Sequence, residues 1–212
     1  GTTYDGELLL VAVGRGPVSD GLGFAEAGVT VDRGFVPVDE HCQTNVANVY
    51  AIGDLRPGLQ LAHVGFAEGI MVAERVGGLP VTPIDYDGVP RITYSDPEVA
   101  SVGLTSAQAT ERGLKTVEFN YNLGGNGRSV ILQTQGAVKV IAMSEEDGPG
   151  RVIGIHIVGS RVSELIAEAQ LIYNWDAEPS DVAQLIHPHP TQSEAIGEAH
   201  LALAGKPLHV HA

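Results

Sequence analysis

A motif near the C-terminus, His187-Pro-His-Pro-Thr-Gln-Ser-Glu194, contains the residue types needed to move a proton near neutral pH. Two prolines flank His189, and because each fixes its own φ and restricts the residue before it, the imidazole is expected on a stiff, extended backbone. Glu194 falls in the first turn of the helix expected to follow, where the helix dipole keeps a carboxylate ionised. An ionised carboxylate beside an imidazole fixes the tautomer of the ring and raises its basicity. The motif therefore predicts that His189 and Glu194 form a general acid/base pair.

The helix that must position this pair is predicted to begin at Thr191 and to run to about Ala204, with Gly205 as its left-handed stop. The residues that open it also form a capping-box sequence, in which Glu194 would simply bond the amide of Thr191. The motif alone leaves the catalytic and the capping interpretations open.

Metal binding is a third interpretation of the histidines. His187 and His189 alternate as on a strand, and His209 and His211 repeat the spacing near the C-terminus. No cysteine or carboxylate of suitable spacing completes a ligand set, so no metal site is predicted.

Composition narrows the classes of function. The chain has 212 residues, of which 43% are hydrophobic and 18% charged, as in a soluble globular protein able to bury an adequate core. A net charge of −14 with only 12 Lys and Arg argues against binding nucleic acid or anionic membranes, and no apolar run is long enough to span a bilayer. Cys42 is the only cysteine, which excludes a disulfide framework. Gly1 begins in what has the pattern of a turn before a buried strand, so we expect the chain to be part of a longer protein.

The first part of the chain has the pattern of an α/β domain. The segment Glu7–Val13 is almost entirely apolar and ends at glycines, which predicts a strand buried on both faces of a parallel sheet. The glycines from Gly14 onward do not form a dinucleotide-binding G-x-G-x-x-G fingerprint. Segments 29–32 and 35–38 are predicted to pair as a hairpin.

The segment Thr44–Asp54 is predicted to be a short strand that ends in Gly-Asp. Such an end lets the backbone approach a ligand closely while the carboxylate of Asp54 accepts hydrogen bonds from sugar-like hydroxyl groups. An amphipathic helix is predicted over Leu61–Arg75, and its first amides, around Gln60 to His63, would favour an anion. His63 could equally be a packing residue at the helix end.

A segment rich in Pro, Gly and Asp, Pro80–Pro90, is predicted to separate two domains. Beyond it, strands are predicted at residues 91–94, 99–104, 116–122, 129–132, 137–143 and 152–158. Helices are predicted at 106–112, opened by the capping box Thr105-x-x-Gln108, and at 161–173. Because no helix start is expected after Gly124–Gly127, that segment is interpreted as a turn. Strands joined by hairpins with segregated helices predict an α+β domain with an antiparallel sheet.

Several segments, in this order and spacing, resemble the C-terminal half of the pyridine-nucleotide disulfide oxidoreductase family, and most closely its dihydrolipoamide dehydrogenases of the actinobacterial type. They are Leu9-Leu-Val-Ala-Val-Gly-Arg15, Thr44–Asp54, Leu59-Gln-Leu-Ala-His63, Tyr94–Thr105 with Asn126-Gly-Arg128, and His187–Glu194. Two positions depart from the family pattern, since Gly16 stands where arginine is usual and Gln60 where methionine is usual.

The resemblance implies roles for particular residues. Asp54 would accept hydrogen bonds from the ribityl or ribose hydroxyls of FAD, and Gly14 would lie against NAD. The isoalloxazine contacts would come from Gln60, Leu61, Ala62 and His63. His189 would take a proton from a dithiol substrate, with Glu194 as its orienting partner.

The resemblance also implies an architecture: an α/β remnant, made of the tail of an NAD-binding domain (1–14) and the returning part of an FAD-binding domain (15–88), followed by an α+β interface domain (89–212). The parent is expected to be a cytoplasmic homodimer with an active site shared across the interface. It would oxidise dihydrolipoamide on the lipoyl domain of a 2-oxo acid dehydrogenase complex, passing electrons through a cysteine disulfide and FAD to NAD.

The redox cysteines and both dinucleotide phosphate loops are expected to precede Gly1. We therefore expect this chain alone to be inactive and to bind neither cofactor stably. The alternatives are another disulfide reductase, of the glutathione or mercuric reductase kind, and a non-catalytic dimerisation module.

Overall fold

The computed structural model describes residues 1–210, so His211 of the second histidine pair lies outside the described residues. The chain forms two compact units, one spanning Gly1–Ile84 and a second that begins at Asp85. The division falls within the Pro- and Gly-rich segment Pro80–Pro90.

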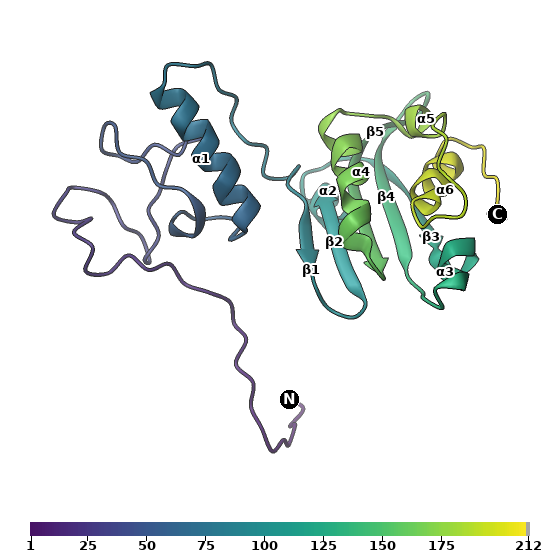
Figure 1. Ribbon diagram of the computed structural model, residues 1–212, viewed down its shortest axis with the longest axis horizontal. Helices are drawn as coiled ribbons and strands as arrows, with labels where there is room; N and C mark the ends of the chain where they lie inside the picture. The colour runs from purple at the N-terminus through teal and green to yellow at the C-terminus, as the bar shows by residue number, and fades with distance from the viewer. Residues whose placement is uncertain (211–212) are drawn as a thin grey trace. The chain divides into compact units, whose positions relative to one another are not determined.

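The second unit is built on a five-stranded sheet in which every neighbouring pair is antiparallel (Figure 1). In the order β1-β2-β5-β4-β3, the strands are β1 (Arg91–Thr93), β2 (Glu98–Gly103), β5 (Gly148–Gly159), β4 (Ala137–Glu145) and β3 (Thr116–Asn122). Along β4, Val138 and Val140 are fully buried, whereas Lys139 between them points to the other face and ion-pairs with Glu118 at 2.9 Å. The predicted antiparallel α+β domain is therefore confirmed.

Helices cover both faces of this sheet. In the described residues, the helices of this unit are α2 (Ser106–Glu111), η2 (a 3-10 turn, Leu123–Gly125), α3 (Gly127–Ile131), α4 (Val162–Asn174), α5 (Pro179–Val182) and α6 (Glu194–Leu203). Helix α4 packs on β2 and β5, and α6 packs on β3 and β4, around a core that contains Ile155, Ile166 and Ile196. Helix α2 covers the opposite face, where Ala109 packs with Ile153. This packing fixes the relative positions of α4 and α6. Along the chain, the His187–Glu194 motif begins between these two helices.

The first unit contains no strand ladder in the described chain. Its helices are η1, a 3-10 turn over Gly53–Leu55, and α1 (Ala62–Val76). The predicted hairpin is reduced to its turn, because Asp32 and Phe35 exchange two backbone hydrogen bonds and the pairing goes no further. A small core of Val29, Val36 and Ala51 holds these loops together.

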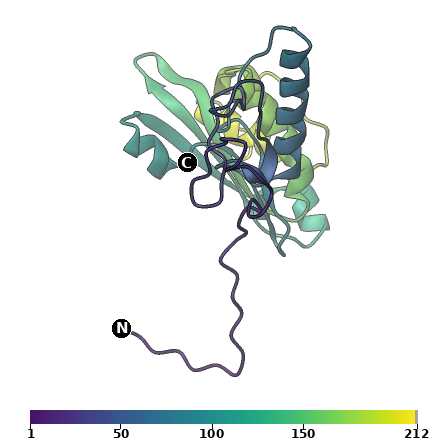
Figure 2. The ribbon, with the colours of Figure 1, turned by 90° about the vertical axis from the view of Figure 1, so that its left-hand side faces the viewer.

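The prediction of a buried strand at Glu7–Val13 is wrong. The segment forms no strand, and Leu8 and Val13 are 90% and 92% exposed. Both ribbon views draw it as an extended trace (Figures 1 and 2). A strand buried on both faces needs neighbouring strands to bond its amides and helices to cover its side chains. The described chain supplies neither at this position. The strand predicted over Thr44–Asp54 is likewise reduced to one bridge between Gln43 and Tyr50.

A second correction concerns residues 129–132, which were predicted as a strand and lie mostly in α3. The Asn126 side chain caps this helix by accepting the N–H of Ser129 at 2.9 Å. A helix therefore does start after Gly124–Gly127, contrary to the reason for which that segment was interpreted as a simple turn. The sequence pattern also missed the four-residue helix α5, which has Pro179 at its start.

The helix that contains the end of the His187–Glu194 motif begins later than predicted, at Glu194 with Ser193 as N-cap, instead of at Thr191. Its predicted stop is confirmed, because Gly205 has a left-handed φ of 72°. The predicted capping box of α2 is also confirmed, with Thr105 and Gln108 bonding each other's backbone amides.

Candidate active site

His189 and Glu194 are in direct contact. The Nδ1 atom of His189 lies 2.9 Å from Oε1 of Glu194, and the other carboxylate oxygen, Oε2, accepts the N–H of Thr191 at 2.8 Å. The two contacts that the sequence left open are thus both present, since one carboxylate bonds the imidazole and the Thr191 amide at the same time, although Ser193 and not Thr191 is the N-cap of the helix. Burial works to raise the pKa of Glu194, but the hydrogen bonds from Thr191 and His189 outweigh it, so this pKa lies below its ordinary value.

The contact determines which nitrogen of His189 can act on a ligand. An ionised carboxylate only accepts hydrogen bonds, so Nδ1 carries the proton and Nε2 of the neutral ring keeps its lone pair. The His189 side chain is 76% exposed, whereas that of Glu194 is 21% exposed. The arrangement therefore offers an accessible base, Nε2, held in one tautomer by a partly buried carboxylate.

The backbone around His189 is held from three sides. The Thr191 hydroxyl donates to the Pro188 carbonyl at 2.6 Å, and the Asn126 side chain donates to the Thr191 carbonyl at 2.9 Å. His187 is bonded to Glu168 of α4 at 2.6 Å. Asn126 is a residue whose role the sequence reasoning missed, although it lies in a segment of the family resemblance. Its near-complete burial, at 4% exposure, follows from bonding both α3 and this loop.

His189 and Glu194 open into a cavity of about 210 Å³. The lining residues are Tyr121, Gly125, Asn126, Gly127, His189, Glu194, Glu198 and His209. Burial, with Glu198 and Glu194 nearby, raises the pKa of Tyr121, so its hydroxyl stays protonated at neutral pH. The cavity thus combines an accessible base with a neutral hydroxyl.

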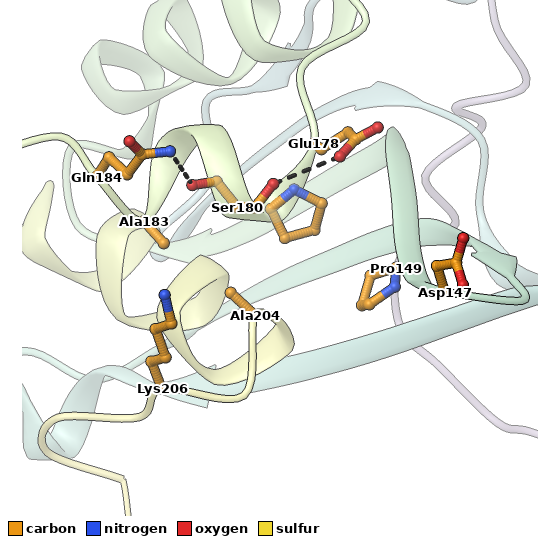
Figure 3. A pocket seen from close by; sticks show the side chains of 9 residues that line it. Asp147, Pro149, Glu178, Ser180, Ala183, Gln184, Ala204 and Lys206 are labelled. Carbon is orange, nitrogen blue, oxygen red and sulfur yellow. Dashed lines mark hydrogen bonds between the residues drawn. The ribbon is translucent and has the colours of Figure 1, made fainter.

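A separate cavity of about 310 Å³ lies between the β4–β5 turn, α5 and the end of α6 (Figure 3). It is lined by Asp147, Glu178 and Lys206 among others, and Figure 3 shows Ser180 bonded to Glu178 and Gln184 bonded to Ser180 within it. None of the predicted site residues lines this cavity.

In the first unit, Asp54 occupies the middle of η1 and is exposed. The turn that carries it is held by Glu68 of α1, which is fully buried. One carboxylate oxygen of Glu68 accepts the N–H of Gly53 at 2.6 Å, and the other pairs with the guanidinium of Arg56 at 2.5 Å. Because these contacts lie on both sides of Asp54, Glu68 fixes the turn that presents the aspartate.

Sequence reasoning missed Glu68, yet a signal for it exists. Val64, Glu68 and Met71 recur at helical spacing and are the buried residues of α1. A carboxylate at a core position of an amphipathic helix is costly unless a charged or N–H partner meets it. Its spacing alone could therefore have identified Glu68 as a residue with a fixed partner.

The predicted flavin-contacting residues lie at the start of α1. Leu61 is the N-cap, Ala62 and His63 begin the helix, and no side chain caps this end, so the positive end of the helix dipole is presented there. The Nε2 atom of Gln60 is buried without a hydrogen-bond partner in the described chain. An unpaired amide donor beside a helix N-terminus fits an acceptor group such as a flavin carbonyl.

The predicted NAD contact is not assembled in the described chain. Gly14 is exposed, and a side-chain carbon added there would meet nothing within 4 Å. These residues therefore do not by themselves fit NAD.

Residues 1–210 hold neither a cluster of side chains suited to a metal ion nor a helix suited to a membrane. No group of three or more His, Cys, Asp or Glu side chains is arranged to hold a metal ion. None of the helices in this part of the chain has the length and apolar character needed to cross a membrane.

Comparisons with known proteins agree with this arrangement. Residues 89–200 match the family described as pyridine nucleotide-disulphide oxidoreductase, dimerisation domain, and residues 1–69 match the family described as pyridine nucleotide-disulphide oxidoreductase. The chain belongs to the pyridine nucleotide-disulphide oxidoreductases. The match over residues 1–69 includes Asp54 and the residues before α1, and the match over residues 89–200 includes His189 and Glu194.

The curated relatives of this oxidoreductase chain are longer than the chain itself. It is 41% identical over 208 residues to a dihydrolipoyl dehydrogenase of Bacillus subtilis, covering 98% of the chain and 43% of the relative. It is 40% identical over 211 residues to the mitochondrial dihydrolipoyl dehydrogenase of Pisum sativum, covering 99% of the chain and 41% of the relative. The chain thus spans less than half the length of these relatives.

A solved structure shows the same fold. The crystal structure of LpdA from Mycobacterium tuberculosis matches with a TM-score of 0.82 and 27% sequence identity, over 89% of this chain and 41% of that one. This similarity supports the mixed α/β arrangement and the antiparallel sheet described above.

Proposed function

We propose that the full-length protein is a dihydrolipoamide dehydrogenase, which oxidises protein-bound dihydrolipoamide to lipoamide and passes the electrons through a cysteine disulfide and FAD to NAD. The observation that carries the proposal is the 2.9 Å contact between His189 and Glu194, which leaves Nε2 as an accessible base. Relatives named dihydrolipoyl dehydrogenase, about 40% identical along nearly the whole chain, support the choice of substrate class.

The proposed role of His189 is to accept a proton from one thiol of the substrate at Nε2. The thiolate formed in this way is the nucleophile that a disulfide exchange requires. Glu194 holds the tautomer that leaves Nε2 unprotonated and stabilises the imidazolium once the proton has arrived. The redox disulfide belongs to the rest of the full-length protein, because Cys42 is the only cysteine of this chain and it is buried.

The residues at the start of α1 and in η1 fit FAD. Asp54 would accept hydrogen bonds from sugar or ribityl hydroxyls, and Gln60, Leu61, Ala62 and His63 would contact the ring system. Bound FAD supplies the transfer of an electron pair between dithiol and nicotinamide. The helix dipole of α1 would favour negative charge on the part of the ring that it meets. Gly14 would contribute to an NAD site only together with residues outside this chain.

The proposed assembly is a homodimer in which His189 serves the flavin of the partner chain, with a lipoyl domain as substrate carrier. The dimerisation-domain match over residues 89–200 supports a two-fold contact through the second unit. In an isologous contact each chain contributes the same surface, so each dimer would contain two identical shared sites.

The test of the reaction is NAD-dependent oxidation of dihydrolipoamide by the flavin-loaded full-length protein. We expect His189→Gln to lower kcat/KM by about 10²–10⁴, which is the usual contribution of a positioned acid/base. The flavin content of the protein should not change, because the residues proposed to hold FAD lie in the first unit. Wild-type protein that reduces glutathione disulfide or mercuric ion but leaves dihydrolipoamide untouched would refute the assignment.

The shared site is tested with mixed dimers. One subunit lacks the redox cysteines and the other carries His189→Gln. If His189 acts across the interface, one of the two sites is intact and about half of wild-type activity is expected. Activity at background in the purified heterodimer would place the histidine in the site of its own chain and contradict the proposal.

A further inference from the structure

Among residues 85–210, three histidines are paired with glutamates, and the proposed reaction uses one of them. The pairs are His187 with Glu168 at 2.6 Å, His189 with Glu194 at 2.9 Å, and His209 with Glu198 at 2.7 Å. The His187 side chain is 13% exposed, whereas those of His189 and His209 are 76% and 65% exposed. His187 is thus the histidine of the motif whose place in the fold is fixed by packing.

The packing around His187 is built for an imidazole. Its Nε2 bonds Glu168 of α4, and its other side lies against Gly197 of α6. A side-chain carbon at Gly197 would come within 2.6 Å of Nδ1 of His187, closer than real contacts of that kind. Only glycine at position 197 therefore leaves room for the ring, and the ring joins α4 to α6 at the point where the motif begins.

The position of His187 bears directly on His189. One residue separates them, so their Cα atoms can be at most about 7 Å apart. That residue is Pro188, whose carbonyl accepts the Thr191 hydroxyl at 2.6 Å, and Thr191 in turn bonds Glu194. The exposed ring of His189 has little packing of its own, so its direction depends on how the two ends of this short loop are held.

We propose that His187 and Glu168 form a positioning pair, which anchors the motif to α4 and sets the orientation in which His189 meets Glu194. His187 touches no reacting atom in this proposal and acts through His189. The proposal rests on the proposed function for its kinetic consequences. Its structural consequence, the ordering of the His189 ring, is independent of any substrate.

Substitutions that differ in hydrogen bonding separate this role from simple packing. Gln at position 187 can place an amide N–H near the position of Nε2, and Gln at position 168 can still offer a carbonyl oxygen, whereas Leu at either position can do neither. In the full-length enzyme we expect His187→Leu and Glu168→Leu to lower kcat for dihydrolipoamide by about 10- to 100-fold with little change in KM, because a small displacement of a catalytic group is costly. His187→Gln and Glu168→Gln should each restore kcat to within about threefold of wild type.

A double-variant cycle and a matched control sharpen the test. If the two residues act only through each other, the double variant His187→Leu with Glu168→Leu should be no slower than the slower single variant. Glu164→Leu changes an exposed glutamate one turn earlier on α4 and should leave kcat unchanged. Additive losses in the double variant, or an equal loss in the control, would overturn the proposal.

The substrate-independent readout is the nitrogen NMR spectrum of His189 in the 212-residue chain. In the unchanged chain at neutral pH, the spectrum should report one tautomer with its proton on Nδ1, bonded to Glu194. In Glu168→Leu it should report an average of both tautomers, and in Glu168→Gln the single tautomer should return. An unchanged tautomer in Glu168→Leu overturns the positioning role even if activity falls.

The two readouts distinguish the possible failures. A wild-type enzyme without activity on dihydrolipoamide, but with the expected spectra, would refute the proposed function and support the positioning pair. Should His187→Leu fail to fold, as judged by circular dichroism, the Glu168 variants provide the same comparison.

Discussion

An apolar segment of the second unit is buried, whereas an equally apolar segment of the first unit is exposed. In the second unit, Ile155 on β5 is fully buried, because β2 and β4 flank its strand and α4 covers it. In the first unit, Leu9 lies in an equally apolar run and is 86% exposed, because no strand or helix of the described chain covers it. An apolar segment therefore forms a buried strand only where other strands flank it and helices cover it.

The polar contacts around Asp54 in the first unit form without flanking strands. Glu68 finds its partners, Gly53 and Arg56, within sixteen residues of sequence, and the turn around Asp54 forms although the predicted strand before it does not. A short-range clamp can thus preserve the shape of a candidate cofactor contact where the sheet around it is absent from the described structure.

The largest expected effect comes from truncating one apolar residue in each unit. Ile155→Ala should lower the free energy of unfolding of the second unit by about 2–5 kcal/mol, because it leaves a cavity in a packed core. Leu9→Ala should change stability by less than about 0.5 kcal/mol, because nothing packs on that side chain. Urea unfolding of the 212-residue chain, followed by the fluorescence of its single tryptophan, Trp175, measures the second unit. Amide hydrogen exchange measures the stability of the first unit. Equal losses for the two variants would erase the contrast between the units.

A smaller effect is expected from pH. Burial lowers the pKa of His200 to about 4, whereas the pKa in the unfolded chain is about 6.5. Between these two pH values the unfolded chain therefore binds a proton that the folded second unit does not. Stability should therefore fall as the pH drops from about 6.5 to 4, by up to about 3 kcal/mol from this group. In His200→Leu this part of the slope should vanish.

His187 contributes with the opposite sign. The hydrogen bond that His187 donates to Glu168 raises the pKa of His187, so the contribution of His187 to stability is present below pH 6.5 and is lost as the pH rises through the raised value. Unfolding curves of wild type, His200→Leu and Glu168→Leu at several pH values separate the two windows. If stability falls as steeply in His200→Leu as in wild type between about pH 6.5 and 4, burial of His200 is not the cause.

The parts of the fold that sequence predicted are those with local causes. The alternation in β3 and β4 and the capping box at Thr105 were recognisable because each depends on neighbours a few residues away. The strand at Glu7–Val13 failed because it depends on partners that a local pattern cannot reveal. The prediction for residues 129–132 failed for a different reason, since the three apolar residues there suggested a strand while the N-cap of a short helix, Asn126, lies just before them.

The candidate site was predictable where it is one continuous motif. His189 and Glu194 meet as expected, because only four residues separate them and a proline on each side of His189 restricts the backbone. The residues that hold the motif were not predicted, since Glu168 and Asn126 approach it from 19 and more residues away and only the folded unit brings them there. Asn126 is polar and almost fully buried, and such a side chain requires a hydrogen-bond partner.

The most direct test of the central claim is the pH–rate profile of the full-length enzyme with Glu194→Gln. Glutamine can keep the bond to the Thr191 amide but loses the charge that stabilises the imidazolium of His189. We expect a lower kcat/KM for dihydrolipoamide, with the acid limb of the profile moved to lower pH. A profile that keeps its shape and position while only the thermal stability changes would show that Glu194 serves only to hold the loop through the Thr191 amide.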